Sequence, residues 1–306
     1  MIPFKNITFI VNPAAGRGKT KHLAERLEVL LKDSPVTHTI LETQYPRHAT
    51  ELARQASGTS DIIVAVGGDG TVNEVASGLI HSPAIFAVLS EGSGNDFARL
   101  INAPSKIDQA VQRYSEAEQR QFDIGKVEVT LHDGSVSERY FFNSLGIGFD
   151  AAVAIRVSQI SWLRGLPLYG AALLQTLFGY KPHLFSLTST EYKNKKKSFV
   201  VCVGNGTWEG GGFKLTPDAL PDDGKFQVCC VYGSSVLNIL PVLPFTINGS
   251  HIKRSNVRVF DTCSLLVESD KPFPVHGDGE IFGTTVVKIK IDLLPKALNV
   301  ASTAAP

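Results

Sequence analysis

The chain lacks a large excess of charge of either sign. Its 306 residues include 30 lysines and arginines and 29 aspartates and glutamates, which gives a formal net charge of +1. Proteins that bind nucleic acids through phosphate contacts usually carry a basic surface. We therefore expect no nucleic-acid partner.

Cysteine is also scarce, and its spacing excludes the common metal and redox motifs. The four residues are Cys202, Cys229, Cys230 and Cys263, and none of them belongs to a CxxC pair. The first three lie in strand-like apolar runs. We expect buried free thiols and a reducing compartment, the cytoplasm.

Apolar runs long enough to cross a bilayer, which takes about 20 residues, are missing as well. The first run, Ile7–Val11, is short and predicts an initial strand rather than a signal peptide. A longer segment, Ser161–Tyr180, is interrupted by Arg164 and Pro167. We predict no transmembrane segment. This segment remains open to two interpretations: a helix of the core, or a helix at a membrane interface or lipid groove.

The first part of the chain, about 120 residues, alternates between strand and helix patterns. Strands are predicted at Ile7–Val11, Thr37–Leu41, Ile62–Val66 and Ile85–Leu89, and helices at Lys19–Leu31, Arg47–Gln55, Thr71–Leu79 and Ile107–Tyr114. Such alternation is typical of a parallel sheet covered on both faces. Ligands of these folds bind beyond the carboxyl ends of the strands.

The second part shows the period of two that is typical of strands. From Phe122 onward, apolar residues alternate with polar ones in runs such as Phe226–Cys230 and Val287–Ile291, between turns rich in glycine and asparagine. We predict an antiparallel sandwich or open barrel. A chain of this length favours two domains, which we place at residues 1–121 and 122–293.

Three glycine-containing loops follow predicted strands of the first part. Their sequences are NPAAGRGK at 12–19, GGDGTVNE at 67–74 and EGSGNDFAR at 91–99. Each leads into a helix, so backbone N–H groups and a positive helix end are offered to an anion. Asp69 lies within the second loop, where a carboxylate favours a role with Mg²⁺. Each loop alone is also compatible with a capped turn. Together they predict a nucleotide-dependent phosphotransferase.

These motifs, in this order, resemble those of the diacylglycerol kinase catalytic-domain family, which includes bacterial lipid kinases and the sphingosine and ceramide kinases. The resemblance continues through Phe122–Gly125, Phe142–Asp150, Gly210–Gly224 and Gly277–Glu280, nearly to the end of the chain. It implies an α/β N-terminal nucleotide domain like that of NAD kinases and phosphofructokinases, and a C-terminal antiparallel β-sandwich. It also implies an active site in the cleft between the domains, with residues 294–306 packing back on the first.

The resemblance further implies ATP and Mg²⁺ as cofactors and assigns residues to them. The nucleotide contacts would be Asn12, Lys19, Thr43, Gly67, Gly68, Asp69, Gly70, Thr71, Val72, Asn73, Glu74, Ser93 and Asn95. The Mg²⁺ at the nucleotide would be held by Asp69, Asp96 and Asp123, directly or through water. A second, structural Mg²⁺ would be held by Leu215, Asp218 and Leu220, in a loop that is otherwise compatible with an ordinary turn.

Transfer of phosphate to a hydroxyl needs a general base within hydrogen-bond reach of that hydroxyl. Asp278 matches the proton acceptor of the family, and Glu280 would orient it or raise its pKa. From the residues alone, Gly277-Asp278-Gly279 predicts a hairpin turn. We interpret His276 as a polar neighbour. The implied catalytic residues are therefore Asp278, Asp69 and Glu280.

The resulting hypothesis is a lipid kinase that transfers the γ-phosphoryl group of Mg-ATP to a lipid hydroxyl. Diacylglycerol is the expected acceptor, which would give phosphatidic acid, and the expected place is the cytoplasmic membrane surface. Two alternatives remain: a kinase of a small soluble acceptor, and a non-catalytic nucleotide-sensing or membrane-scaffold protein. The sequence does not decide the acceptor or whether the chain forms a homodimer.

Overall fold

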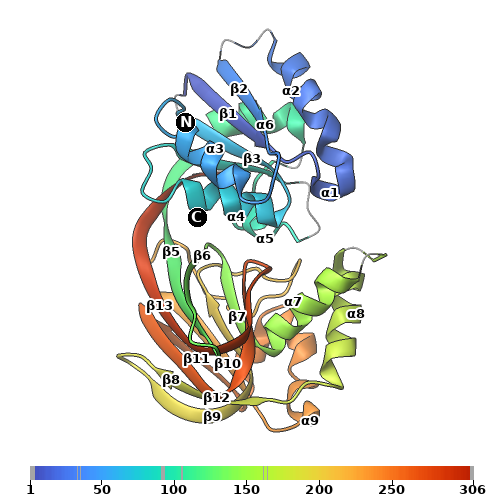
Figure 1. The fold of residues 1–306 in the computed structure, drawn as a ribbon, viewed down its shortest axis with the longest axis vertical. Coiled ribbons are helices and arrows are strands. Elements are labelled where there is room, and N and C mark those ends of the chain that lie inside the picture. The colour runs from blue at the N-terminus through green and yellow to red at the C-terminus, as the bar shows by residue number, and fades with distance from the viewer. Residues whose placement is uncertain are drawn as a thin grey trace. The chain divides into compact units, whose positions relative to one another are not determined.

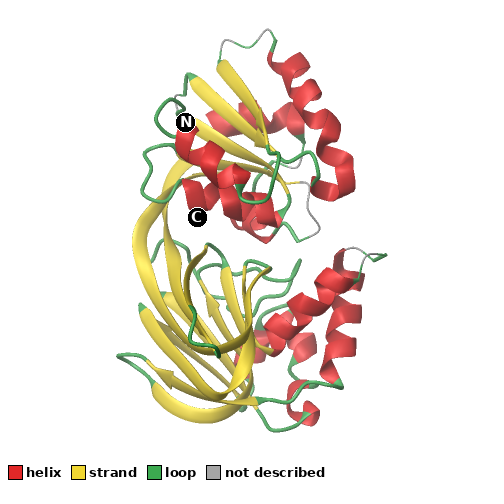
Figure 2. Ribbon diagram, in the orientation of Figure 1, coloured by secondary structure: helices red, strands yellow, loops and turns green. Residues whose placement is uncertain are grey.

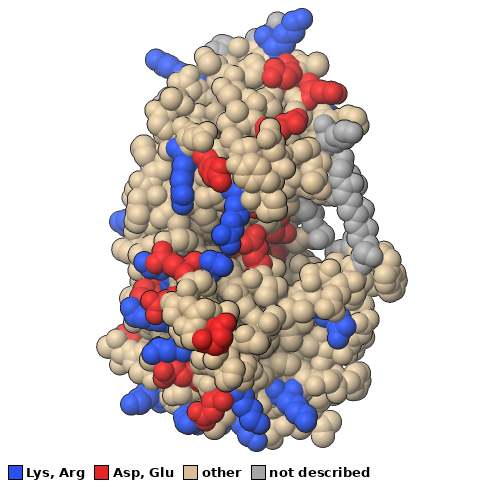
Figure 3. Space-filling view, in the orientation of Figure 1, with Lys and Arg blue, Asp and Glu red and all other residues tan. Residues whose placement is uncertain are grey.

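The computed structural model describes residues 4–32, 34, 36–90, 94–104, 106–160, 162–163 and 165–303. The chain forms two compact units, which Figure 1 draws as a ribbon. Unit 1 comprises Met1–Phe122 and Lys296–Pro306, and unit 2 comprises Asp123–Pro295. Each unit has a hydrophobic core of its own. On the face drawn in Figure 3, basic and acidic side chains are intermixed, in keeping with the balanced charge of the sequence.

Unit 1 is built on a parallel sheet, as the sequence predicts. Strands β1 (Asn6–Val11), β2 (Thr37–Glu42), β3 (Ile62–Gly67) and β4 (Ile85–Ser90) pair in the order β2-β1-β3-β4. These pairings are all parallel. Every residue of β3 is buried, which agrees with a central strand of a sheet that is covered on both faces.

Helices lie on both faces of this sheet (Figure 2). On one face, α2 (Leu23–Leu31) and α6 (Ile107–Ser115) share a core with alternate residues of the strands. On the other, α3 (His48–Ala56) packs against α4 (Asp69–Gly78). The short elements are α1 (Ala15–Gly18), η1 (Lys19–His22) and α5 (Asp96–Leu100).

The predicted helix over Lys19–Leu31 is broken, and this expectation is corrected. Its first turn is the separate 3₁₀ segment η1, and the α-helix begins only at Leu23. The hydroxyl of Thr20 donates to the carbonyls of Asn12 and Ala15, at 2.5 and 3.1 Å. Because this side chain bonds to the preceding loop, it competes with regular helix geometry at this point.

Unit 2 is an antiparallel β-sandwich, as predicted. Its strands are β5 (Glu118–Leu131), β6 (Val136–Phe141), β7 (Ser144–Gly148), β8 (His183–Thr188), β9 (Lys193–Gly204), β10 (Phe226–Tyr232), β11 (Val257–Thr262), β12 (Ser264–Gly277) and β13 (Glu280–Ser302). The main sheet has the order β11-β10-β9-β7-β12-β13, while β5 pairs with β6 and β13, and β8 with β9 and β12. Neighbours from β11 to β13 run antiparallel. The first residues of β5, up to Phe122, and the last residues of β13, from Lys296, belong to unit 1, where Val300 pairs with Phe86 of β4.

The period of two in this unit reflects two cores on opposite faces of one sheet. Val201 and Val203 of β9 face the core of the sandwich, whereas Val200 and Cys202 face a second core. That second core is completed by α7 (Phe149–Gln159), α8 (Gly165–Leu177) and α9 (Val236–Ile239). The remaining short elements are η2 (Leu243–Thr246) and η3 (Ser250–Lys253).

Within the segment 161–180, α8 spans Gly165–Leu177, and the described part of the segment has both buried and exposed apolar side chains. Ala172 and Leu177 are buried in the second core, as a core helix predicts. Leu174 and Phe178, four residues apart, are 56% and 82% exposed. Within the described ranges, no helix has the length and apolar character needed to span a bilayer.

The cysteines are free, and three of them are buried as expected. Cys202, Cys229 and Cys230 lie within β9 and β10. The expectation of burial is wrong for Cys263, which is exposed. It lies at the turn between β11 and β12, outside both cores.

Candidate active site

The loops that follow β1, β3 and β4 meet at one edge of the unit 1 sheet. Asn12, after β1, donates its side-chain amide to the hydroxyl of Thr71, after β3, at 3.0 Å. Asn95, after β4, donates its backbone N–H to Oδ2 of Asp69 at 3.2 Å. These contacts confirm that the three glycine-containing loops converge at the carboxyl ends of the strands, where ligands of such folds bind.

Asp69 is the first residue of α4 and lies at the centre of this edge. Burial raises the pKa of its carboxyl group, while hydrogen bonds from the backbone amides of Asn95 and Asp96 act in the opposite direction. A partly desolvated carboxylate is a suitable ligand for a hard cation, because the cation relieves the cost of its burial. The residue therefore fits the predicted Mg²⁺, and this role stays a prediction.

The glycines beside Asp69 allow a close approach of the backbone. A Cβ on Gly67 would overlap the side chain of Thr71, so another residue would move that threonine away from Asn12. Gly68 precedes the helix and Gly70 lies in its first turn, where backbone N–H groups have no partners within the helix. This turn is the part of the site that suits a phosphate group.

Two other predicted nucleotide contacts have clear structural partners. The carboxylate of Glu74 accepts the backbone N–H groups of Arg47 and Ala49, at 3.0 and 3.2 Å, and so caps the start of α3. Thr43 donates its backbone N–H to the carbonyl of Val11 at 2.9 Å, which places it beside the end of β1. Whether either residue also contacts a nucleotide remains a prediction.

The structure describes the surroundings of some of the remaining predicted contacts of unit 1 and not of others. Val72 and Asn73 are buried in α4. Asn95 has a left-handed backbone, with φ of 55°, and its side chain contacts the hydroxyl of Ser90. Asp96 forms an ion pair with Arg99 at 2.9 Å. Ser93 and the side chain of Lys19 lie outside the described residues.

Asp278 lies at the tip of the hairpin between β12 and β13. Gly277 pairs with Glu280 across the hairpin, and the two residues between them, Asp278 and Gly279, have φ of 51° and 86°. Positive φ at both positions is the mark of a type I′ turn. The hairpin turn predicted from the residues alone is confirmed. This conformation is compatible with a catalytic role as well.

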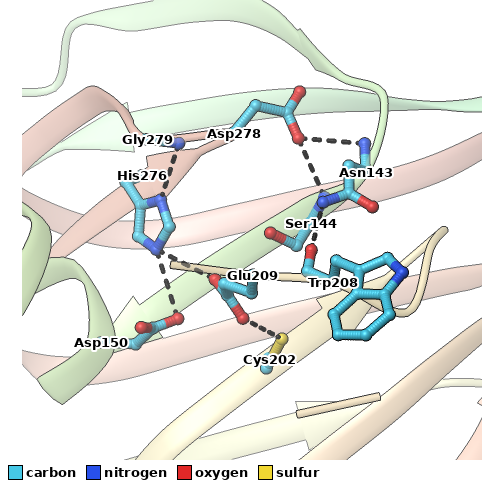
Figure 4. Close-up of polar contacts among 9 residues, drawn as sticks. All are labelled: Asn143, Ser144, Asp150, Cys202, Trp208, Glu209, His276, Asp278 and Gly279. Carbon is cyan, nitrogen blue, oxygen red and sulfur yellow. Dashed lines mark hydrogen bonds and ion pairs between the residues drawn. The ribbon is translucent and has the colours of Figure 1, made fainter. Parts of the chain in front are cut away.

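The carboxylate of Asp278 accepts three consecutive backbone amides. Phe142 donates to Oδ2 at 2.7 Å. Asn143 and Ser144 each donate to Oδ1 at 2.9 Å (Figure 4). The backbone N–H of Asp278 also donates to the carbonyl of Ser144. Burial raises the pKa of the carboxyl group, and the amides of residues 142–144 lower it. Both oxygens of the carboxylate are therefore fixed by backbone amides at the start of β7.

The loop predicted to hold a structural metal is fastened to the rest of unit 2 by hydrogen bonds. Asp123, which is buried, accepts the backbone N–H of Gly224 at 2.8 Å. The carbonyl of Leu215 contacts Nε2 of His251 at 3.1 Å, and the backbone N–H of Asp218 donates to Gln227 at 3.1 Å. The side chain of Leu220 is exposed. None of these contacts tests the metal, which stays a prediction.

A buried cluster near Asp278 was missed by sequence reasoning. Nε2 of His276 lies 3.2 Å from Oδ2 of Asp150 and 3.4 Å from Oε1 of Glu209 (Figure 4). Cys202 donates its thiol to Oε2 of Glu209 at 3.3 Å. Among the described residues, Asp150, Glu209 and His276 are grouped closely enough to hold a metal ion, and none of them is a predicted metal ligand. They are distant in sequence, so no local motif connects them.

Burial gives this cluster unusual proton affinities. It raises the pKa of Glu209 to about 8, and the charge of Asp150 acts in the same direction. Burial lowers the pKa of His276, but the two neighbouring carboxyl groups raise it overall. Asp150, Glu209 and His276 therefore compete for a small number of protons.

Comparison with protein families finds matches to two models. Residues 6–127 match the diacylglycerol kinase catalytic domain. Residues 143–302 match the YegS C-terminal NAD kinase beta sandwich-like domain. The two matches follow one another along the chain and cover both units.

Similar proteins of bacteria match over almost their whole length. The chain is 30% identical to a Bacillus subtilis protein named "Putative lipid kinase YtlR", over 92% of this chain and 95% of that protein. It is 26% identical to a protein of Mycobacterium tuberculosis named "Diacylglycerol kinase", over 96% of this chain and 94% of that protein. Among solved structures, a crystal structure from Bacillus anthracis described as "a putative diacylglycerol kinase" matches with a TM-score of 0.77. It is 22% identical and covers 99% of both chains, which supports the fold.

Proposed function

The chain belongs to the lipid kinase family defined by the diacylglycerol kinase catalytic domain, and we propose that it transfers the γ-phosphoryl group of Mg-ATP to the hydroxyl of diacylglycerol. The product would be phosphatidic acid. The observation that carries this proposal is the carboxylate of Asp278, which three backbone amides fix at the tip of the hairpin turn. Phosphoryl transfer depends mainly on such positioning and on neutralisation of charge.

Unit 1 supplies the nucleotide side of the proposed reaction. The turn from Gly68 to Thr71 would receive phosphate oxygens on its backbone N–H groups at the start of α4. Asp69, and Asp96 beside it, would hold Mg²⁺, which neutralises phosphate charge when it is bound. The hydrogen bond from Asn12 to Thr71 keeps the first two loops in register for this task.

Unit 2 supplies the acceptor side. Asp278 would take the proton of the attacking hydroxyl, and the amides of Phe142, Asn143 and Ser144 would keep its carboxylate in position. A Cβ on Gly279 would meet only open space, so the turn leaves room next to the base. Glu280, which is exposed at the start of β13, would act on Asp278 through its charge.

A lipid acceptor accounts for the exposed apolar face of α8. Leu174 of α8 and Phe178, directly after the helix, are exposed, and Trp162 just before the helix is 77% exposed. Apolar side chains of this size are costly to leave in water, and aromatic residues at a helix edge are typical of membrane-interface segments. We propose that this face contacts the cytoplasmic membrane surface, where diacylglycerol resides, and that the enzyme is peripherally associated there.

Incubation with radiolabelled ATP tests the proposal directly. Diacylglycerol in mixed micelles and a water-soluble glycerol derivative would be offered separately, and the labelled products identified. We expect labelled phosphatidic acid, formed only with the lipid and only with Mg²⁺ present. Transfer to the soluble acceptor regardless of micelles would support a small-molecule kinase instead. Binding of ATP without transfer to any hydroxyl would support a non-catalytic role.

A further inference from the structure

His276 links the buried cluster to the turn that carries Asp278. The residue is the penultimate one of β12, and it is 4% exposed. Nδ1 accepts the backbone N–H of Gly279 at 3.2 Å, while Nε2 faces Asp150 and Glu209 (Figure 4). One ring thus contacts both the turn and the two carboxyl groups.

These contacts define the tautomer of the ring. The N–H of Gly279 points at Nδ1, so this nitrogen must offer its lone pair and carries no proton. The ring proton is then on Nε2, directed at Oδ2 of Asp150. The carboxyl groups favour a second proton on the ring. The Gly279 amide opposes that proton, because its N–H already lies where a proton on Nδ1 would have to sit. We place one proton on the ring, at Nε2.

The same geometry argues against a metal ion in the cluster. A histidine that binds a metal through one nitrogen usually donates the N–H of the other to a neighbour. In His276 the other nitrogen accepts a hydrogen bond instead. A metal at Nε2 would therefore require a ring without any proton. The group of Asp150, Glu209 and His276 is better described as a proton-sharing cluster.

The cluster is packed too closely for its members to move independently. Gly146 of β7 pairs with His276, and a Cβ at this glycine would overlap both His276 and Asp150. On the far side, the thiol of Cys202 donates to Glu209. The ring therefore packs against the backbone of Gly146, faces two carboxyl groups at Nε2 and accepts the Gly279 amide at Nδ1.

We propose that His276 is a positioning residue for the base: Asp150 and Glu209 hold its ring as the Nε2–H tautomer, and Nδ1 fastens the Asp278–Gly279 turn. This inference rests on the proposed role of Asp278. The turn is then secured on two sides, by the amides of 142–144 at the carboxylate and by His276 at the Gly279 amide. Without His276 the Gly279 amide loses its acceptor, and the turn keeps its hydrogen bonds to residues 142–144.

Two substitutions separate the two nitrogens of the ring. In His276→Asn the side-chain oxygen can take the place of Nδ1 and accept the Gly279 N–H. In His276→Gln the amide reaches the position of Nε2 and leaves Gly279 without its acceptor. His183→Asn, at a half-buried histidine of β8 that bonds to Pro272, is the matched control.

The structural part of the proposal is tested on the wild-type protein and these variants by NMR. The ¹⁵N signals of His276 should report a proton on Nε2 only at pH 7. Exchange of the Gly279 amide should accelerate about tenfold in His276→Gln and change little in His276→Asn, as expected for loss of one hydrogen bond. A doubly protonated ring, a proton on Nδ1, or equal exchange in both variants would overturn the proposal.

The catalytic part is tested by steady-state kinetics with lipid acceptor. We expect kcat to fall at least about tenfold in His276→Gln and less in His276→Asn, because small displacements of a base are costly. In both His276 variants, KM for ATP and the thermal midpoint of unfolding should stay close to the wild-type values. In His183→Asn, kcat, KM for ATP and the thermal midpoint should all match the wild type. Unchanged kcat in folded His276→Gln contradicts the inference. A wild-type protein that transfers no phosphate contradicts the proposed function alone, since the NMR results still decide the anchoring of the turn.

Discussion

Asn95 donates its backbone N–H to Oδ2 of Asp69 at 3.2 Å, which ties the loop after β4 to the first residue of α4. The contact orients the carboxylate of Asp69 at the carboxyl edge of the unit 1 sheet. Two of the three sequence motifs are thereby joined at a single side chain. This relationship makes Asp69 the first residue to test for the binding of a cation with the nucleotide.

Replacement of Asp69 by asparagine should weaken the use of Mg²⁺. The amide keeps the size of the side chain and its acceptor for Asn95, but it loses the negative charge that binds the cation. We expect the Mg²⁺ concentration for half-maximal activity to rise about tenfold or more, as for loss of one charged ligand worth over about 1.4 kcal/mol. Titration of activity with Mg²⁺ at saturating ATP measures this change.

Asp108 provides the matched control in the same unit. It is half exposed on α6 and paired with Arg26 at 2.8 Å, an interaction of small energy at a surface. Asp108→Asn should leave the Mg²⁺ titration unchanged. If Asp69→Asn responds to Mg²⁺ as the control does, the carboxylate is not a cation ligand.

The unfolding free energy should depend on pH through Glu209. Its pKa is about 8 in the folded chain against 4.5 as the reference value, so the folded chain retains a proton that the unfolded chain releases between these pH values. Stability therefore falls as the pH rises through this window, by up to about 1.4 kcal/mol per pH unit, and levels off above pH 8.

Glu209→Gln mimics the protonated acid and should flatten this dependence. Urea unfolding at pH 6, 7 and 8 would compare the variant with the wild type and with Glu128→Gln, an exposed glutamate of β5. We expect the wild-type slope in the control and a smaller slope in Glu209→Gln. Parallel curves for all three proteins would show that Glu209 does not hold the proton.

The exposed face of α8 should govern binding to lipid vesicles. Leu174→Ser with Phe178→Ser removes two large apolar side chains that we place at the membrane surface. Burial of one such side chain is worth about 1.5–3 kcal/mol, so vesicle binding should weaken at least about tenfold. Cosedimentation with diacylglycerol-containing vesicles measures the change.

Val136, 60% exposed on the β6 hairpin, is the control for this surface. Val136→Ser should bind vesicles as the wild type does. The membrane assignment of α8 is wrong if the double variant binds equally well, or if both proteins lose binding to the same extent.

Much of unit 1 could be predicted because its strands are continuous apolar runs with clear ends. The limits of the four strands differ from the predicted ones by at most one residue. For β1 and β3, the apolar run is ended sharply by Asn12 and by the glycine pair at 67–68. The convergence of three loops followed from the parallel arrangement alone. The Asp278–Gly279 turn was likewise local, because an Asp-Gly pair suits two consecutive positive φ values.

The elements that escaped prediction depend on contacts distant in sequence. Helix α7 follows β7 without a loop, and the change of direction occurs at Gly148, with φ of 90°. Its apolar residues fit a strand as well as a helix. The cluster of Asp150, Glu209 and His276 has no local pattern, because β7, β9 and β12 bring it together only through their register. The sequence pattern therefore predicts no role for His276 beyond that of a polar neighbour.

Single-turnover transfer by Asp278→Asn is the most direct measurement of the proposed chemistry. The control is Asp270→Asn, at an exposed aspartate that lies 3.7 Å from Lys195. The variant, the wild type and this control would be mixed with radiolabelled Mg-ATP and diacylglycerol micelles, and ATP affinity measured in parallel. We predict that Asp278→Asn forms labelled phosphatidic acid at least about a hundredfold more slowly, with ATP binding and fold retained, while Asp270→Asn matches the wild type. Transfer by Asp278→Asn at the wild-type rate would contradict the account.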